Sequence, residues 1–577
     1  MPALAVLYDP KAGNWLRFSE PLEEIEVHDP DKVLPALEYI EQRVEKAGLF
    51  AAGFIGYEAA PAFDAALKTH ASGEFPLLSF NLFGKAERID LPMPVGNADL
   101  PDWRSEENEA EFSRRVDSIR AAIARGETYQ VNLTFPLTSE FSQDPWPFFL
   151  HLVHGQQAGG AGYLQTDRWV ICSVSPELFF SRDGDQLRMR PMKGTAARGR
   201  TLAEDLCLAE ELEKSAKNRA ENIMILDMVR NDLGRLAAPG EVRVEAICSL
   251  EKYPTVWQLT STVTARSKAS LPEIFQALFP CASITGAPKI KTMQIITTTE
   301  TRPRQLYTGA FGWIAPGRQA HFNVAIRTVL IDQLHKRATY GVGAGITWDS
   351  NCADEYQECL DKAAVLSRPS EDFALIETMR WVPGKGYFLL EEHLVRLLTS
   401  AEYFNIACCG AQVIDHLQTL AKSLPATPQR IRLLLHQDGR LQTTCAKLEP
   451  TPLSPLKLCL ARQPVDSRLT LLYHKTTQRR VYETCLAEAE EADEVVLWNE
   501  RGEVTECCTA NLVVLTSGKL ITPALSSGLL PGTYRNFLLK RGILTEKILT
   551  ADDLSNASHI FLINAVRKWR RAMFCRQ

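Results

Sequence analysis

The pattern of hydrophobic and polar positions predicts two regions that each mix helices with strands. Between residues 202 and 236, apolar residues such as Leu212, Leu226 and Val229 recur at helical spacing with charges between them, which predicts a long amphipathic helix. A second helix is predicted near residues 355–366, and β-rich runs occupy much of the remaining sequence. We therefore expect an α/β region that extends from the first residue to about residue 365.

A short polar segment with a proline, Ser-Arg-Pro-Ser-Glu-Asp at 367–372, predicts a domain boundary. After it a strand (373–380), a glycine-containing hairpin (383–386) and a helix (391–404) are expected in succession. A chain of 577 residues is also longer than one hydrophobic core usually organises. We therefore predict two domains, residues 1–367 and residues 368–577.

Composition narrows the class of protein. The formal charge of −6 includes no basic excess, so we expect no nucleic-acid partner. The 14 cysteines are scattered, without zinc-site spacing or a disulfide framework, which favours a reducing cytoplasm. No apolar run approaches the roughly 18 residues of a membrane span, and the N-terminus lacks the basic flank of a signal peptide. We expect a soluble cytoplasmic protein with no membrane partner.

The first candidate chemistry lies at the end of the first region. Glu355, Glu358 and Lys362 stand at offsets of three and four, which places them on one face of a helix. A solvated charged helix gives the same pattern. The glycine-rich segment 340–346 before it would, however, expose backbone N–H groups to an anionic ligand. Glu221 adds a second carboxylate centre, and two separated carboxylates suit Mg²⁺.

Seven motifs follow one another along the first region: GETYQVNL (126–133), SPELF (175–179), RPMKGT (190–195), SITGAPK (283–289), IRT (326–328), GAGI (343–346) and EYQECLDKA (355–363). In this order they resemble the chorismate-utilising enzymes, a family that includes anthranilate, isochorismate, salicylate and aminodeoxychorismate synthases. The resemblance implies an α/β (α+β) fold in which helices flank a β-sandwich core.

The resemblance also implies a substrate site for the dianion chorismate. Glu221 and Glu358 would bind Mg²⁺, with Glu355 assisting through water, and the ion would hold the ring carboxylate. Arg327 and Tyr307 would bind the enolpyruvyl carboxylate. The remaining implied substrate contacts are Gly343, Ala344, Gly345, Lys362, Thr285 and Gln258. The last of these is a departure, because many relatives have histidine at the position of Gln258.

Lys193 distinguishes the branches of this family. Anthranilate synthases typically have a small residue at this position, whereas the aminodeoxychorismate synthase branch has a lysine that attacks C2 of chorismate. Such a nucleophile must be neutral, so its pKa must fall from about 10.4. Glu177 would be the general acid that protonates the departing C4 hydroxyl. Gln130 replaces the lysine base of the isochorismate-forming relatives. The alternative is that Lys193 is a surface lysine in a turn.

No cysteine of the chain has the glycine-rich context and downstream histidine of a glutaminase nucleophile. We therefore expect a separate glutamine amidotransferase as the partner that supplies ammonia.

The second region carries four further motifs: HLVRLLTSAEYF (393–404), YHKTTQRRVYE (473–483), GEVTECCTANLVV (502–514) and GLLPGTYR (528–535). They resemble the fold-type IV pyridoxal-phosphate enzymes, which include branched-chain and D-amino-acid aminotransferases and aminodeoxychorismate lyase. GEVTECCTANL is similar to the lyase branch in particular. The resemblance implies a two-lobed fold and pyridoxal 5′-phosphate as the cofactor. Because enzymes of this type usually pair two subunits, it also implies a homodimer through this region.

Lys475 is the implied Schiff-base lysine. Arg396 and the backbone of Gly532 and Thr533 would hold the cofactor phosphate, and Glu506 would pair with the pyridine nitrogen. Taken singly, Lys475 is as consistent with a solvated lysine and Glu506 with the end of a hairpin. The resemblance implies a supporting role for Asn511. Lys568 is a departure, because relatives often have glycine at this position.

Together the two resemblances imply a bifunctional enzyme of 4-aminobenzoate synthesis, which supplies a folate precursor. Chorismate would be aminated to 4-amino-4-deoxychorismate, and pyruvate would then be eliminated. Two alternatives are an anthranilate synthase component I fused to a class IV aminotransferase, and an inactive chorismate- or cofactor-binding subunit. Lys193 and the Cys507-Cys508 pair argue against the first alternative. The retained Glu177, Glu358 and Lys475 argue against the second.

Overall fold

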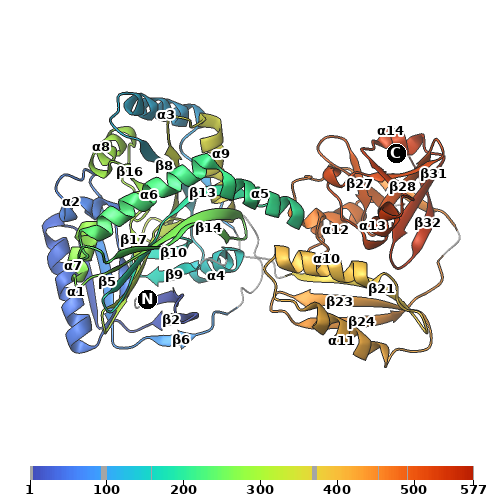
Figure 1. The fold of residues 1–577 in the computed structure, drawn as a ribbon, viewed down its shortest axis with the longest axis horizontal. Coiled ribbons are helices and arrows are strands. Elements are labelled where there is room, and N and C mark those ends of the chain that lie inside the picture. The colour runs from blue at the N-terminus through green and yellow to red at the C-terminus, as the bar shows by residue number, and fades with distance from the viewer. Residues whose placement is uncertain are drawn as a thin grey trace. The chain divides into compact units, whose positions relative to one another are not determined.

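The computed structural model describes residues 4–92, 100–156, 159–366, 373–451, 454–489 and 492–575. The chain forms two compact units (Figure 1). The first unit comprises Met1–Ala197 and Ala209–Ser370, and the second comprises Arg198–Leu208 and Glu371–Gln577. The predicted boundary between residues 367 and 368 lies outside the described residues. No helix of the described ranges is long and apolar enough to cross a membrane.

The first unit is built on two large antiparallel β-sheets that share a core. Ala5 and Ile171 of one sheet and Phe54 and Phe311 of the other belong to a single buried cluster, so the sheets pack face to face. In spatial order the first sheet is β16 (Gly286–Ala287), β8 (Gln130–Glu140), β20 (Arg337–Ile346), β19 (Thr328–Asp332), β10 (Trp169–Ser175), β9 (Gly160–Gln165), β1 (Leu4–Asp9), β2 (Asn14–Phe18) and β6 (Glu87–Ile89), with β7 (Arg104–Ser105) beside β8. The second is β13 (Met192–Ala197), β15 (Val256–Arg266), β12 (Gln186–Arg190), β11 (Leu178–Asp183), β18 (Gln319–Val324), β17 (Ala310–Ala315), β4 (Phe50–Ile55), β5 (Leu78–Phe83) and β3 (Glu23–Val27), with β14 (Val242–Lys252) beside β15.

Helices cover the outer face of each sheet. Buried residues of one core cluster come from the second sheet and from α1 (Val33–Ala47), α6 (Ala216–Gly234) and α7 (Leu271–Leu278). Another cluster joins the first sheet to α3 (Glu109–Ala124), α4 (Pro145–Gln156), α8 (Lys289–Thr299) and α9 (Cys352–Ala363). The predicted β-sandwich core with flanking helices is therefore confirmed.

The prediction of one long helix over residues 202–236 is wrong. The structure has two helices, α5 (Leu202–Lys214) and α6, and Ser215 between them has an extended backbone with φ −61° and ψ 112°. The Ser215 side chain accepts a hydrogen bond from the Asn218 amide, which is the usual way in which serine starts a helix. The second predicted helix, near residues 355–366, is confirmed by α9.

The second unit has two sheets, which form its two lobes. The smaller sheet, in the order β22 (Gly386–Tyr387), β21 (Ala374–Val382), β23 (Gln429–His436) and β24 (Leu441–Lys447), packs against α10 (Leu390–Tyr403) and α11 (Gly410–Ala421). The larger, mixed sheet is β27 (Val504–Cys507), β26 (Glu494–Trp498), β25 (Leu456–Leu460), β32 (Lys568–Phe574), β31 (His559–Asn564), β28 (Asn511–Thr516), β29 (Lys519–Pro523) and β30 (Thr545–Lys547). It is accompanied by α12 (Arg480–Ala487), α13 (Thr533–Lys540) and α14 (Ala551–Ser555). The predicted two-lobed architecture, the strand near 373–380 and the helix near 391–404 are confirmed.

The second unit contains a segment from the middle of the first region, Arg198–Leu208, which we call the strap. Within the strap, Arg198 Nε lies 2.7 Å from Asp205 Oδ1, and both side chains are buried. The Arg198 guanidinium also stacks over the ring of Tyr403 and donates to its carbonyl at 3.0 Å. The Tyr403 hydroxyl in turn donates to the Gly199 carbonyl at 2.7 Å. The strap therefore contains a buried ion pair and is fixed to α10 by a ring contact and hydrogen bonds.

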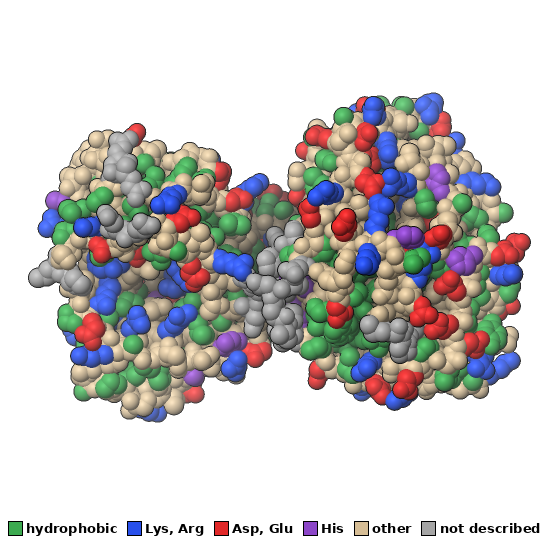
Figure 2. Space-filling view, turned by 180° about the vertical axis from the view of Figure 1, so that it is seen from behind, with side chains coloured by type: hydrophobic (Ala, Val, Ile, Leu, Met, Phe, Trp, Pro, Cys, Tyr) green, Lys and Arg blue, Asp and Glu red, His purple; other side chains and the backbone are tan. Residues whose placement is uncertain are grey.

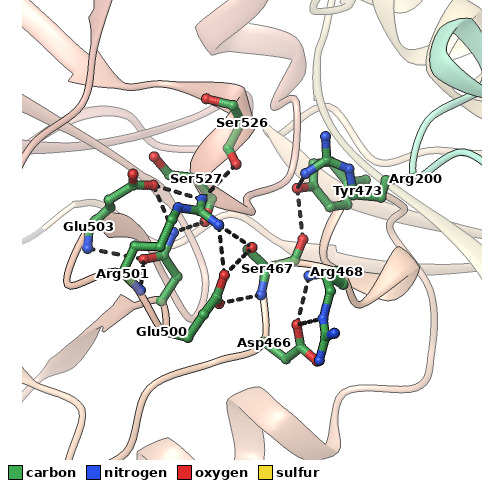
Figure 3. A network of polar contacts seen from close by, with 11 residues as sticks. Arg200, Asp466, Ser467, Arg468, Tyr473, Glu500, Arg501, Glu503, Ser526 and Ser527 are labelled. Atoms are coloured by element: carbon green, nitrogen blue, oxygen red, sulfur yellow. Dashed lines mark hydrogen bonds and ion pairs between the residues drawn. The ribbon is translucent and has the colours of Figure 1, made fainter. Parts of the chain in front are cut away.

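The strap also contacts the two residues that precede Lys475. Arg200 Nη1 lies 3.1 Å from the Tyr473 hydroxyl, and the Arg200 carbonyl lies 3.2 Å from His474 Nε2. Figure 3 shows the Tyr473 hydroxyl donating to the Ser467 carbonyl, while the Ser467 hydroxyl donates to Glu500 in a wider polar network. Residues more than 250 positions apart thus contact each other directly before the candidate cofactor lysine, Lys475.

Candidate active sites

In the first unit Lys193 extends from β13 toward the glycine-rich strand β20. A Cβ atom on Gly345 would lie only 2.6 Å from Lys193 Nζ and would also collide with the amide of Gln130. Glycine is therefore what allows the amine and the amide to approach this strand. The structure brings three of the predicted motifs together here. Burial lowers the pKa of Lys193, although the carboxylates of Glu221 and Glu358 oppose that shift.

Glu177 follows β10 and is almost fully buried. Ser283 Oγ donates to its Oε1 at 2.5 Å. Burial raises the pKa of Glu177 to about 7, against the opposing effects of the Ser283 hydrogen bond and the Lys193 charge. A carboxyl group with this pKa holds a proton for much of the time near neutral pH, so it can act as a general acid.

The three carboxylates predicted to bind magnesium have different surroundings. Glu358 Oε1 pairs with Lys362 Nζ at 2.7 Å, and Lys362 also donates to the Gly343 carbonyl at 2.8 Å. Glu355 accepts a hydrogen bond from Ser350 at 2.7 Å, and burial raises its pKa. Among the described residues, no three His, Cys, Asp or Glu side chains are grouped so as to hold a metal ion.

A magnesium site that takes part of its shell from substrate and water fits the residues present. Mg²⁺ uses few protein oxygens and keeps several waters. The charges of Glu221 and Glu358 both raise the pKa of Lys193, so both carboxylates lie near this side chain. They could supply two oxygens for such an ion, but not a complete cage.

Arg327 and Tyr307 were expected at one substrate carboxylate. Arg327 is 9% exposed, has an unusual positive φ of 47°, and donates to Gln156 Oε1 at 2.8 Å. The ring of Tyr307 lies directly against Gly341. Tyr307 also lines a cavity of about 820 Å³ on the first sheet, but Lys193, Glu177 and Arg327 do not line that cavity.

Thr285 and Gln258 are both buried near other parts of the site. The Thr285 hydroxyl donates to the carbonyls of Cys281 and Ala282, each at 3.2 Å. Gln258 lies on β15 directly opposite Thr195 of β13, whose hydroxyl donates to Gln258 Oε1 at 3.2 Å. Gln258 therefore supports the strand that carries Lys193.

Asn222 and Ser283 contribute to this site but were not among the predicted residues. The Asn222 side chain donates to the Lys193 carbonyl at 3.1 Å and to the Leu259 carbonyl at 3.0 Å, which fixes β13 against α6 and β15. The sequence did contain a signal for Asn222, because this asparagine directly follows Glu221 on an otherwise apolar buried face.

In the second unit one cavity of about 430 Å³ collects the predicted cofactor residues. Its lining includes Lys475, Arg396, Glu506, Asn511, Gly532 and Thr533. Burial, with the charges of Arg396 and Arg479, lowers the pKa of Lys475 to about 8. The backbone of Lys475 is held to β21, since the Ile376 amide donates to the Lys475 carbonyl at 2.8 Å.

Glu506 is 4% exposed and lies at the centre of a hydrogen-bond network. Its Oε1 accepts from the Tyr482 hydroxyl at 2.9 Å and from the Leu530 amide at 3.1 Å. Its Oε2 accepts from Asn511 Nδ2 at 3.1 Å. Burial raises the pKa of Glu506 to about 7. The network fixes a carboxylate that could pair with a protonated ring nitrogen, and it explains the supporting role expected of Asn511.

A further part of the cavity lining suits a phosphate group. Gly532 precedes α13, and a Cβ atom on it would overlap Asn511 Oδ1, so only glycine fits at this helix start. Backbone N–H groups at a helix N-terminus attract anions. Arg396 pairs with Glu377 at 2.7 Å, and His393 pairs with the same carboxylate at 2.5 Å. Although burial opposes it, these two partners hold the pKa of Glu377 at about 2. Glu377 and His393 had not been predicted.

Lys568, the other departure from relatives, does not line this cavity. It has a φ of 58°, its side chain is exposed, and its ammonium lies over the ring of Phe388. Its neighbour Arg567 does line the cavity.

The sandwich of two sheets and the lysine–glutamate site beside a glycine-rich strand define the first unit as a chorismate-binding type of protein. The chain belongs to the chorismate binding enzyme family, which it matches over residues 4–368. Residues 374–573 match the amino-transferase class IV family. Both resemblances predicted from the motifs are therefore confirmed.

Curated relatives match part of the first unit. The chain is 38% identical over 263 residues to aminodeoxychorismate synthase component 1 of Klebsiella aerogenes, which is 45% of this chain and 58% of that protein. It is 34% identical over 274 residues to anthranilate synthase component 1 of Streptomyces coelicolor, which is 46% of this chain and 52% of that protein. The matches thus span between half and two thirds of these relatives.

A solved structure with the fold of the first unit is anthranilate synthase component I from Streptococcus pneumoniae. It has a TM-score of 0.54 and 22% sequence identity, and it covers 64% of this chain and 92% of that one. This likeness establishes the fold of the first unit.

Proposed function

We propose that the chain makes 4-aminobenzoate from chorismate in two steps: amination to 4-amino-4-deoxychorismate in the first unit, and elimination of pyruvate in the second. The observation that carries the first step is a lysine of lowered pKa at position 193, which lies against Gly345 and is influenced by the charge of Glu177. The six predicted cofactor residues around one cavity support the second step.

In the first step the neutral Lys193 amine attacks C2 of chorismate. The two conjugated ring double bonds shift and the C4–O bond breaks, while Glu177 gives its proton to the departing hydroxyl, which leaves as water. Ammonia then attacks C4, both double bonds shift back, and the C2–N bond to Lys193 breaks. Mg²⁺ held by Glu221 and Glu358, with Glu355 through water, would supply positive charge at the ring carboxylate. Covalent attack replaces one difficult displacement by two easier ones.

In the second step the chain's own groups bind, orient and move protons. Pyridoxal phosphate, when bound, supplies an electron sink. Arg396 and the N–H groups of Gly532 and Thr533 would hold the phosphate, and Glu506 would keep a proton at the ring nitrogen. Lys475 would hold the cofactor, and its amine would take the proton from C4 of the substrate. Pyruvate leaves as the carbon ring becomes aromatic.

We infer that ammonia comes from a separate glutamine amidotransferase, since the similar Klebsiella protein is called component 1. We also infer that two copies of the second unit pair, as in class IV enzymes. If ammonia comes from the partner, glutamine should support turnover only when the amidotransferase is added. If two copies pair, light scattering of the purified chain should give twice its 64.5 kDa mass.

The decisive experiment supplies the purified chain with chorismate, ammonium, Mg²⁺ and pyridoxal phosphate. We expect 4-aminobenzoate and pyruvate in equal amounts, separated by chromatography, and no turnover when Mg²⁺ is removed by a chelator. Anthranilate as the product would contradict the proposal and would favour an anthranilate synthase joined to a class IV aminotransferase.

A further inference from the structure

The cavity that contains Lys475 carries more positive charge than a cofactor phosphate requires. The cationic residues of its lining are Arg396, Arg430, Arg432, Lys475, Arg479, Arg567 and Arg570. Among the described lining residues, Glu506 is the only carboxylate. The proposed cofactor contacts use Arg396, Lys475 and Glu506, which leaves a group of arginines without an assigned role. Figure 2 shows Lys and Arg side chains gathered around a hollow on the second unit, at the left of that view.

Arg430 and Arg432 project from the same face of β23. Buried and exposed residues alternate along this strand, and both arginines occupy exposed positions. Arg432 is directly opposite Thr378 of β21, and Thr378 also lines the cavity. Neither arginine side chain has an ion pair or a hydrogen bond with another described residue. The smaller sheet therefore presents two adjacent free guanidinium groups to the cavity.

Arg570 approaches the cavity from the larger sheet. It is half-buried on β32, and its Nε is buried without a hydrogen-bond partner in the described part of the chain. Burial lowers the pKa of Arg570, which reflects the cost of a partly desolvated cation. Arg479 and Arg567, by contrast, donate to the carbonyls of Cys508 and Glu449. The charge of Glu494 acts on Arg570 and opposes that shift, but the buried Nε keeps an unused hydrogen-bond donor. Guanidinium groups with unused donors thus lie on both lobes of the cavity.

A buried or crowded cation needs an anionic partner, and arginine binds carboxylates through two parallel hydrogen bonds. We propose that Arg430, Arg432 and Arg570 bind the two carboxylates of a dianionic enolpyruvyl substrate. The β23 pair takes one carboxylate and Arg570 takes the other. This subsite rests on the proposed pyruvate-releasing function and adds the specificity of that site. It selects a dicarboxylate amine over the monocarboxylate amino acids used by aminotransferases.

The test uses the full chain loaded with pyridoxal phosphate and supplied with 4-amino-4-deoxychorismate, with pyruvate as the readout. Arg430→Ala and Arg432→Ala should each raise KM by about 10- to 100-fold, as for loss of a charge-assisted hydrogen bond, while kcat changes less. Arg570→Ala should have a similar effect. Arg432→Lys should restore part of the loss. The cofactor absorbance band and the cofactor content should match those of the wild type.

Arg440→Ala is the matched control. Arg440 lies in the turn after β23, pairs with Asp438 at 3.7 Å, and does not line the cavity, so its loss should leave KM unchanged. Raised salt should increase the KM of the wild type more than the KM of Arg432→Ala. Salt screens the attraction between Arg432 and the substrate carboxylate, and the variant already lacks that attraction.

The outcomes separate the two proposals. If the wild type releases no pyruvate from this substrate, the proposed second function is wrong and the subsite with it. If the wild type is active and the three alanine variants keep its KM, the function stands and the carboxylate subsite is overturned. If the variants lose bound cofactor, these arginines hold the cofactor phosphate, which also overturns the subsite.

Discussion

The two candidate sites each depend on a lysine of lowered pKa, but the largest charge contribution at each lysine has the opposite sign. At Lys193 it comes from Glu221, which raises the pKa that burial lowers. At Lys475 it comes from Arg396, which adds to the effect of burial, although Glu377 and Glu506 oppose it. The main charge therefore cooperates with burial in the second unit and competes with it in the first.

The competition in the first unit has a chemical reason. A site that must protonate a leaving hydroxyl and bind a divalent cation needs carboxylates beside its nucleophile. A divalent cation bound there would cancel part of their charge and so lower the pKa of Lys193 further. Metal binding and formation of the free amine are thus expected to be coupled.

The largest expected effect is loss of the second step in Lys475→Ala. Without this amine the proton at C4 has no acceptor, and pyruvate release should fall by about 10³-fold or more, while the aminated intermediate accumulates from chorismate. Chromatography of the intermediate and a pyruvate assay measure both quantities. Pyruvate release at the wild-type rate would show that Lys475 is not the second nucleophile.

Lys193→Ala should cause a loss of similar size in the first step alone. The variant should not consume chorismate, because the covalent route is closed, but should still release pyruvate when given 4-amino-4-deoxychorismate. Unchanged chorismate consumption would instead remove the basis for assigning the first unit to amination.

Glu177→Gln should slow amination by about 10²- to 10³-fold, since a general acid is lost. The pH dependence gives a sharper test. Glu177 must be protonated, so amination by the wild type should decline as pH rises through about 7, the pKa that burial gives this carboxyl. That decline should be absent in the variant. If it persists, another group is the acid.

Arg198→Ala should destabilise the second unit rather than either chemistry. It leaves Asp205 buried without its partner, which typically costs about 3–5 kcal/mol. A lower unfolding temperature, followed by the absorbance of bound cofactor, measures the loss. Arg468→Ala removes an exposed pair with Asp466 in the same unit and should cost about 1 kcal/mol or less. Equal effects would mean that the strap is not a structural part of this unit.

The smallest expected effect is a pKa shift at Lys475. Arg479→Gln removes a cation that lowers this pKa, so the value should rise from about 8 by up to about one unit. The neutral amine is then formed only at higher pH. The rate at which the cofactor-free chain takes up pyridoxal phosphate should shift to higher pH accordingly. Arg480→Gln, at an exposed position that does not line the cavity, should leave the profile in place.

The sequence predicted those parts of the fold and sites that local patterns encode. Motifs located Lys193, Glu177 and the cofactor residues, because each motif carries its own turn, strand or helix start. The break at Ser215 was missed although a serine in a polar stretch is a common helix start. Arg430 and Arg432 could have been noticed as alternate positions on a strand, but nothing local shows that their face lines a cavity.

The strap could not have been predicted in this way. Its partners Tyr403 and His474 lie about 200 and 270 positions further along the chain, and no periodicity within Arg198–Leu208 records them. The predicted helix continued smoothly through this segment, so its membership of the second unit depends on contacts that only the folded chain reveals.

The strap limits how this pair of units could be separated genetically. Cutting the gene at the polar segment 367–372 would give a C-terminal product that lacks Arg198, Arg200 and Asp205, and so lacks the groups that brace Tyr473 and His474 just before Lys475. The N-terminal product would in turn lose the Tyr403 ring and carbonyl that Arg198 contacts. A working split of the gene would first require a replacement for these residues of the strap, which would help to keep the two proposed activities on one polypeptide.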